Sequence, residues 1–97
     1  MEESTDTEYP INGVLDLHMF RPREVAAVVE EYLFACGKKG ILDVRIIHGK
    51  GIGTLRDQVR KQLAGHPGVA SSSSGDGGSG GWGATIVRLQ PFPWRKD

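Results

Sequence analysis

Cysteine is scarce in this sequence, since Cys36 is the single one among 97 residues. A lone cysteine excludes an internal disulfide framework. The chain also has no apolar run that approaches the roughly 20 residues of a membrane span or the flanks of a signal peptide. We therefore expect one small cytoplasmic domain with no membrane partner.

An excess of charge is absent as well, because 12 basic and 12 acidic residues cancel. Zero net charge by itself argues against a nucleic-acid partner, but the charges are unevenly placed. The stretch 38–63 holds Lys38, Lys39, Arg45, Lys50, Arg56, Arg60 and Lys61 against only Asp43 and Asp57. Such a basic stretch is compatible with a phosphate-facing surface and equally with an ordinary solvated helix face.

Shifts in composition predict how the chain is organised. Residues 1–10 are acidic and polar without periodicity, which is typical of a flexible leader or the end of a linker. Residues 11–90 form the predicted domain, and within it 71–81 are almost entirely Ser and Gly, the composition of a flexible loop. Residues 91–97 are a tail whose prolines forbid central strand pairing and whose aromatic side chains could cover a sheet edge.

Two amphipathic helices are predicted between apolar strands. Apolar residues recur at helical spacing from Val25 to Cys36, after Pro22 and before Gly37, which is expected to cap the helix. A second helix is expected after a capping box formed by Thr54 and Asp57, with an apolar residue at every fourth position up to Leu63, before Gly65 and Pro67 stop it.

Strands are expected at 13–18, at 41–48, from 68 to 70 and at 83–90. The fold class is therefore α/β (α+β), a two-layer sandwich in the order β-α-β-α-β-β. Both helices should cover one face of a four-stranded mixed sheet, with the last two strands antiparallel across the Ser/Gly loop.

Each of the first two strands ends on a histidine. Asp16 and His18 close the first strand and His48 closes the second, and the helical crossover makes these strands parallel, so both imidazoles should meet at one sheet edge. Two imidazoles there can act as general base and general acid near neutral pH, with Asp16 orienting His18. Alternatively, each histidine only caps its strand by hydrogen-bonding backbone groups.

A glycine-rich run follows His48 directly. Gly49, Gly51 and Gly53 allow positive φ and close approach of a phosphate to the main chain, and the next helix N-terminus attracts an anion. Lys50 adds a mobile positive charge. The spacing matches neither a P-loop nor the dinucleotide fingerprint, so no nucleotide cofactor is expected. A tight strand-to-helix connection would need the same glycines for geometry alone.

A metal site is not expected. Asp16, His18, His48 and His66 match no zinc spacing, and Cys36 falls on the apolar stripe of the first helix. The sequence therefore requires no cofactor, and a weakly held divalent ion such as Mg²⁺ remains compatible with Asp16.

Three short motifs occur in order: Leu15-Asp16-Leu17-His18, His48-Gly49-Lys50-Gly51 followed by Leu55-Arg56, and Gly80-Gly81-Trp82-Gly83-Ala84-Thr85 leading into Val87-Arg88-Leu89. In these motifs the chain resembles a small MutS-related (Smr) domain, from about Val14 to Leu89. The resemblance implies a fold similar to the C-terminal domain of translation initiation factor three, which is the arrangement reached above.

The resemblance also implies endonucleolytic activity: nicking of DNA in members attached to MutS-like proteins, and cleavage or binding of RNA in others. The family's functional positions carry over to Asp16 and His18 and to the run His48-Gly49-Lys50-Gly51. Met19 departs from the pattern, because the first motif often continues with glycine. Some nuclease-active members have Thr-Gly-Arg-Gly at the second motif, so His48 and Lys50 are a variant of it.

These features predict a sequence-nonspecific endonuclease with DNA or RNA as its partner. His18 and His48 would move protons, residues 49–53 would hold the scissile phosphate, and Arg56, Arg60 and Lys61 would follow the flanking backbone. A non-catalytic nucleic-acid-binding module would use the same loop, and a protein-interaction domain would show no salt-dependent affinity for nucleic acid. The chain is compatible with a place in a longer protein or in a larger repair or RNA-processing assembly.

Overall fold

The computed structural model describes residues 10–49, 54–75 and 83–94 of the chain. Within these ranges lie, in order, β1 (Val14–Asp16), the short 3-10 turn η1 (Leu17–Met19), α1 (Pro22–Lys39), β2 (Asp43–Ile47), α2 (Thr54–Ala64), β3 (Val69–Ser74) and β4 (Ala84–Leu89). This succession of helices and strands is the predicted one. No helix in the described ranges is long and apolar enough to span a membrane.

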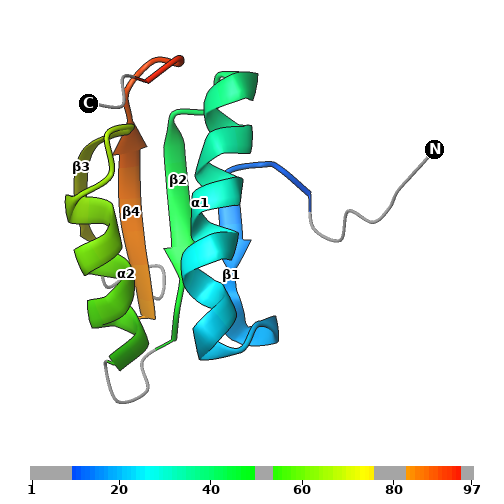
Figure 1. Cartoon of the computed structure of the whole chain (residues 1–97), viewed down its shortest axis with the longest axis vertical. Helices are drawn as coiled ribbons and strands as arrows, with labels where there is room; N and C mark the ends of the chain where they lie inside the picture. Colours follow the sequence, from blue (N-terminus) through cyan, green and yellow to red (C-terminus); the bar gives the residue numbers. More distant parts are fainter. Residues whose placement is uncertain (1–9, 50–53, 76–82, 95–97) are drawn as a thin grey trace.

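The strands form one mixed sheet in the order β1-β2-β4-β3 (Figure 1). β1 and β2 run parallel, with Leu15 opposite Ile46, and β4 pairs antiparallel with both β2 and β3. Both helices cover the same face, in front of the sheet in Figure 1. The predicted two-layer α+β fold is therefore confirmed, and the crossover through α1 is what makes β1 and β2 parallel.

The core lies between the helices and the sheet. Leu15, Val44 and Val87 point into it from three neighbouring strands, because alternate side chains of a strand share one face. The buried apolar residues of the helices are Val25, Val29, Tyr32, Leu33 and Cys36 on α1 and Val59 and Leu63 on α2. The apolar side chains that alternate along the strands thus pack against those that recur at helical spacing in the two helices.

Tyr32 ties α1 to the start of β1. Its hydroxyl oxygen accepts hydrogen bonds from the backbone N–H groups of Asn12 (3.2 Å) and Gly13 (3.0 Å), and the hydroxyl donates to the Val14 carbonyl (3.0 Å). Burial raises the pKa of this phenol, so the hydroxyl keeps the proton that it donates. These bonds hold the beginning of the strand that ends at Asp16.

α1 ends later than the sequence predicts. Gly37, the expected cap, lies inside the helix, and the cap is Gly40 with φ of +80°. Gly37 serves packing instead, because a Cβ atom there would lie 2.6 Å from Cζ2 of Trp94. The prediction of the helix end was wrong because helix-end patterns are local, whereas this contact joins α1 to the tail.

β3 is longer than the sequence predicts. The predicted Ser/Gly loop began at residue 71, whereas β3 continues to Ser74, which lies opposite Thr85 of β4. Its serine side chains are exposed at the edge of the sheet, so pairing with β4 rather than local composition makes this strand. Residues 76–81 of the predicted loop lie outside the described residues, as do residues 1–9 of the predicted leader.

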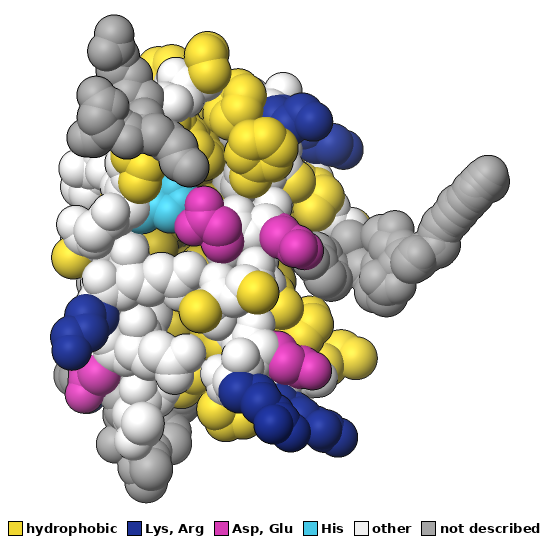
Figure 2. Space-filling model, viewed as in Figure 1, with side chains coloured by type: hydrophobic (Ala, Val, Ile, Leu, Met, Phe, Trp, Pro, Cys, Tyr) yellow, Lys and Arg dark blue, Asp and Glu magenta, His cyan; other side chains and the backbone are white. Residues whose placement is uncertain are grey.

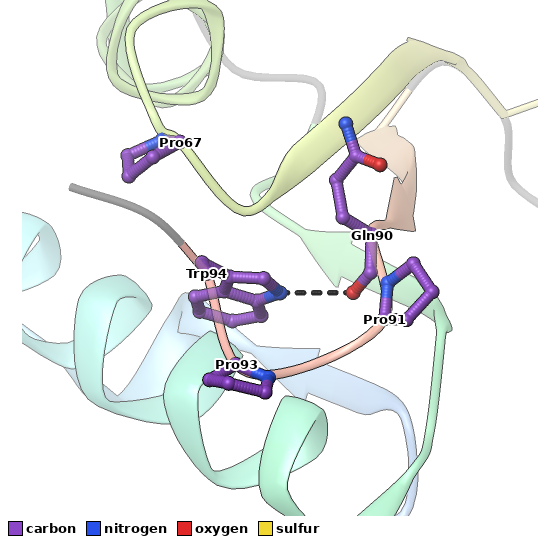
Figure 3. Close-up of a pocket in the computed structure, with 5 residues that line it drawn as sticks. All are labelled: Pro67, Gln90, Pro91, Pro93 and Trp94. Carbon is purple, nitrogen blue, oxygen red and sulfur yellow. Dashed lines mark hydrogen bonds between the residues drawn. The ribbon is translucent and has the colours of Figure 1, made fainter. Parts of the chain in front are cut away.

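The described part of the tail packs on α1 and on the turn between α2 and β3, rather than along a sheet edge. Trp94 donates a hydrogen bond from Nε1 to the Gln90 carbonyl at 2.8 Å (Figure 3). The Trp94 ring also meets the His66 ring edge to face, with centroids 5.2 Å apart. These contacts lie at the opposite end of the sheet from the C-terminal ends of β1 and β2 (Figure 1).

Candidate functional site

The candidate site lies where β1 and β2 end, at the lower edge of the sheet in Figure 1. Asp16 lies opposite Ile47 in the parallel register. His18 and His48, which follow these two positions, therefore leave the sheet at the same edge, as expected for neighbouring parallel strands. The pairing brings together two motifs that lie about thirty residues apart in the chain.

Asp16 holds His18 by its backbone and by its ring. One carboxylate oxygen of Asp16, Oδ1, accepts the His18 backbone N–H at 2.9 Å and lies 2.6 Å from Nδ1 of the His18 ring. The backbone hydrogen bond, helped by the imidazole, lowers the pKa of Asp16 below its ordinary value. The sequence predicts a strand through His18, but the strand ends at Asp16 because this side chain caps the turn η1.

The opposite ring nitrogen of His18 is directed at Gly49. A carboxylate only accepts hydrogen bonds, so Nδ1 of His18 carries the proton in the neutral ring and Nε2 keeps a free lone pair. A Cβ atom built on Gly49 would lie 3.0 Å from this Nε2, and the φ of Gly49 is +87°. The His18 side chain is 62% exposed. Glycine at position 49 thus leaves free the space beside this nitrogen that a Cβ atom would fill.

His48 has a different environment from His18. It is only 6% exposed, with Nε2 2.8 Å from Oγ1 of Thr85 and Nδ1 3.1 Å from the Gly49 carbonyl oxygen. Burial lowers the pKa of His48, and the positive charges of Arg60 and Arg56 lower it further, against the opposing effect of the Gly49 carbonyl. Both ring nitrogens are therefore engaged within the protein, which is the hydrogen-bonded alternative considered for these histidines.

The amide of Gly49 is also engaged. The backbone N–H groups of His48 and Gly49 both donate to the Gly83 carbonyl, each at 2.9 Å. The sheet hydrogen bonding thus continues past the end of β2 and uses this donor, and the role of residues 49–53 in holding a phosphate stays a prediction. Lys50, Gly51 and Gly53, the rest of the predicted phosphate loop, lie outside the described residues.

Two of the three predicted basic contacts of α2 lie near the site. Arg56 and Arg60 are close enough to His48 to depress its pKa, and they share one side of the helix because they are four residues apart. Arg60 also donates to Oγ of Ser74 in β3. Lys61 is exposed and lies about 100° around the helix from Arg60. The first two arginines are therefore better placed than Lys61 to meet a ligand at this edge.

Basic side chains elsewhere on the helix-covered face lie in separate groups near its margins. In Figure 2 the described Lys and Arg residues form no continuous patch over that face. An extended polyanion would therefore meet no continuous row of the described basic side chains on this face.

His66 is used structurally, far from the candidate site. Its Nδ1 accepts the Gly68 backbone N–H at 2.8 Å, and its Nε2 lies 3.1 Å from a carboxylate oxygen of Glu30. Among the residues that the structure describes, no group of three His, Cys, Asp or Glu side chains is placed to hold a metal ion.

Sequence reasoning missed one residue of the site, Thr85. Its side chain is fully buried and contacts His48 across 37 positions in the chain. The signal in the sequence was a hydroxyl residue within a strand that is otherwise apolar up to Val87. Nothing local distinguishes such a threonine from one chosen for its strand propensity.

The fold and this site define a class of protein: a small α+β domain that presents a carboxylate-held histidine beside a positive-φ glycine at the end of two parallel strands. The chain belongs to the Smr domain family, whose family model matches residues 15–90. The resemblance seen in the three sequence motifs is thereby confirmed.

Similar proteins include much longer ones. Endonuclease MutS2 of Pelotomaculum thermopropionicum is 42% identical over 79 residues, which are 81% of this chain and 10% of that protein. The putative endonuclease MutS2 of Bacillus subtilis is 41% identical over 83 residues, which are 86% of this chain and 11% of that protein. The chain therefore spans about a tenth of the length of these curated relatives.

Two solved structures share the fold over most of the chain. The Smr domain of Thermus thermophilus MutS2 has a TM-score of 0.78 and 32% identity, covering 82% of this chain and 100% of that one. YdaL, a stand-alone small MutS-related protein from Escherichia coli, has a TM-score of 0.76 and 27% identity, covering 86% of this chain and 68% of that one. The fold thus occurs both within a longer protein and on its own.

Proposed function

We propose that this Smr domain is a sequence-nonspecific endonuclease that cleaves phosphodiester bonds of DNA or RNA, with His18 as the group that moves the proton. The observation that carries the proposal is the geometry of His18: Nδ1 is 2.6 Å from Asp16, the ring is exposed, and Nε2 faces a glycine. The similar MutS2 proteins are named as endonucleases, which supports the same chemistry.

In this proposal neutral His18 acts as general base. Its Nε2 accepts the proton of the attacking oxygen, which belongs to water or, in RNA, to the neighbouring 2′-hydroxyl. The new oxygen–phosphorus bond forms while the bond to the leaving oxygen breaks, and that oxygen takes a proton from solvent. Asp16 holds the ring in the required tautomer and offsets the positive charge that His18 gains.

Phosphate contacts in the proposal come from two sources. Arg56 and Arg60 lie beside the site and can offset the charge of the phosphate and of its neighbours. Lys50 and the glycines after it, which follow Gly49 in the sequence, supply the remaining contacts. Gly49 itself contributes space for the substrate rather than a donor, because its N–H is bonded to Gly83.

The proposal needs no cofactor, and it treats Mg²⁺ as a condition to be tested. It places the domain in the cytoplasm, where a buried free thiol such as Cys36 is commonly found. It also allows the domain to act within a longer protein, as its similarity to a tenth of each MutS2 protein suggests, or in a larger repair or RNA-processing assembly.

The experiment that tests the proposal compares the parent protein with His18→Ala and Asp16→Asn. Each is incubated with supercoiled plasmid and with end-labelled single-stranded RNA, with and without Mg²⁺. We expect His18→Ala to lose about 10²- to 10⁴-fold in cleavage rate, which is the usual contribution of a general base. Asp43→Asn is the matched control, because Asp43 is an exposed carboxylate that pairs with Arg88 away from the site. Absence of product from the parent protein, or equal product from His18→Ala, refutes the endonuclease.

A non-catalytic binding module is the second candidate. The observation that favours it is the burial of His48, which leaves His18 as the histidine with an exposed ring among the three, all of them described. A binding module should bind DNA or RNA with an affinity that falls as the salt concentration rises. Arg56→Ala and Arg60→Ala should each reduce the slope of log affinity against log salt by about 1, which corresponds to one lost phosphate contact. In that case His18→Ala leaves the affinity unchanged and there is no turnover to lose.

A further inference from the structure

Two hydrogen-bonding contacts lead from the interior of the sheet to Gly49, and the exposed His18 lies beside that glycine. Thr85 Oγ1 lies 2.8 Å from Nε2 of His48, and Nδ1 of His48 lies 3.1 Å from the Gly49 carbonyl oxygen. The position of a Cβ atom on Gly49 is in turn 3.0 Å from Nε2 of His18. Thr85 lies in β4, next to β2, and it is fully buried.

We propose that Thr85 and His48 form a buried positioning pair that fixes the backbone of Gly49 against His18, so that His48 serves the reaction through Gly49 and never touches the substrate. This inference rests on the proposed function, because it assigns His48 and Thr85 to the same reaction that His18 performs. It also replaces the expected role of His48 as a second proton carrier.

The directions of the hydrogen bonds define the state of the pair. A carbonyl oxygen only accepts, so Nδ1 of His48 carries a proton and donates it to Gly49. Nε2 of the neutral ring then accepts the hydroxyl proton of Thr85. Burial and the nearby cations Arg56 and Arg60 lower the pKa of His48 and so keep the ring neutral, while the Gly49 carbonyl, which only accepts, selects the tautomer.

Hydrogen bonds hold Gly49 through both its backbone N–H and its carbonyl oxygen. Its N–H donates to the Gly83 carbonyl at 2.9 Å, and its own carbonyl accepts from His48. Glycine has more backbone freedom than any other residue, so a glycine at φ of +87° keeps one conformation only if its neighbours impose it. The two bonds impose it, and they do so at the residue where a Cβ atom would lie 3.0 Å from Nε2 of His18.

Thr85 is suited to be the fixed end of these contacts. A β-branched residue in the middle of a sheet has little rotamer freedom, and this one is paired on both sides, opposite Ile46 in β2 and Ser74 in β3. Alternatively, the Thr85 hydroxyl could serve only as a hydrogen-bond partner for the buried His48 ring. The contact would then be the same, but it would have no effect on His18. The difference between these two roles can be measured.

The test compares Thr85→Val, which keeps the shape and removes the hydroxyl, with Thr85→Ser, which keeps the hydroxyl. We expect Thr85→Val to lower kcat by about 10- to 100-fold with little change in KM, because displacement of a reacting group by about 1 Å can reduce a rate about 100-fold. Thr85→Ser should recover most of that loss. Tyr32→Phe is the matched control, since it also removes one buried hydroxyl but at the other end of β1.

Nuclear magnetic resonance of the same proteins supplies a readout that does not depend on cleavage. In the parent protein the nitrogen shifts of His48 should report a proton on Nδ1, and Thr85→Val should shift the Gly49 amide signal and the ring signals of His18. Tyr32→Phe should leave those signals in place. If the parent protein shows no cleavage at all, the proposed function fails, and these signals still decide whether the pair is coupled to His18.

Three results would overturn the positioning pair. One is a parent His48 that carries its proton on Nε2. Another is a folded Thr85→Val protein with unchanged His18 ring signals, whatever its activity. The third is a loss of kcat that Thr85→Ser does not recover. If Thr85→Val does not fold, the tautomer in the parent protein and the Thr85→Ser signals remain decisive.

Discussion

Replacement of Gly49 by alanine tests the contact on which the site is built. The φ of Gly49 is +87°, and an L-residue in that region loses about 1–2 kcal/mol. The new methyl would also lie 3.0 Å from Nε2 of His18. Because the His18 side chain is 62% exposed, the ring can swing away, and the additional loss is limited to its bond with Asp16, about 1 kcal/mol. We expect Gly49→Ala to lose about 2–3 kcal/mol in total.

Gly40→Ala is a matched control for the backbone effect alone. Its φ is +80°, and a Cβ atom there would meet nothing within 4 Å. It should lose about 1–2 kcal/mol, and the difference between the two variants measures the contact with His18. Urea or guanidinium unfolding, with equal slopes for all variants, gives these free energies.

The activities should separate the two variants more strongly than their stabilities. In Gly49→Ala the ring of His18 is displaced from Asp16, so cleavage should fall toward the level of His18→Ala, about 10²- to 10⁴-fold. Gly40→Ala should keep full activity per folded molecule. In a His18→Ala background the additional loss of stability from Gly49→Ala should disappear, because the ring that it meets is gone. Equal losses of stability in Gly49→Ala and Gly40→Ala, with Gly49→Ala still fully active, would refute the reasoning.

Three further predictions concern stability. Tyr32→Phe should reduce the free energy of unfolding by about 1–2 kcal/mol, measured in urea, because it removes the hydrogen bonds that hold the start of β1; an unchanged midpoint would contradict the role of this hydroxyl. Gly37→Ala should lower Tm and alter the Trp94 fluorescence, because the new methyl group meets the Trp94 ring. Without that contact, alanine in place of glycine would stabilise a helix interior by about 1 kcal/mol. In a Trp94→Ala background the same change should be less destabilising, and an identical effect in both backgrounds would exclude the contact. The pKa of His48 is lower in the folded protein than in the unfolded chain, so as pH falls His48 is protonated first in the unfolded chain. The free energy of unfolding should therefore decrease as pH is lowered through about 6.5. His48→Gln should show a smaller decrease between about pH 7.5 and pH 5.5.

The sequence by itself determined the elements whose signals are local. The apolar spacing from Val25 to Cys36 predicts α1, since every fourth or third side chain of a helix faces the same way. The β-α-β order predicts that β1 and β2 are parallel, and this places the two histidine motifs at one edge. That Asp16 and His18 act together was also predictable, because residues two apart share one face of a strand. The sequence did not show that Asp16 instead caps a turn, which brings the same two residues together.

The tertiary structure decided the features that depend on partners far along the chain. The two histidines look alike in sequence, yet His48 is buried and contacts Thr85 of β4, whereas the His18 side chain, held at Nδ1 by Asp16, is 62% exposed. The role of Gly37 likewise depends on Trp94, which lies 57 positions later in the sequence. Local patterns report backbone preference and the direction of side chains within one element. Burial and hydrogen-bond partners belong to pairs of elements, and they exist only once the sheet has formed.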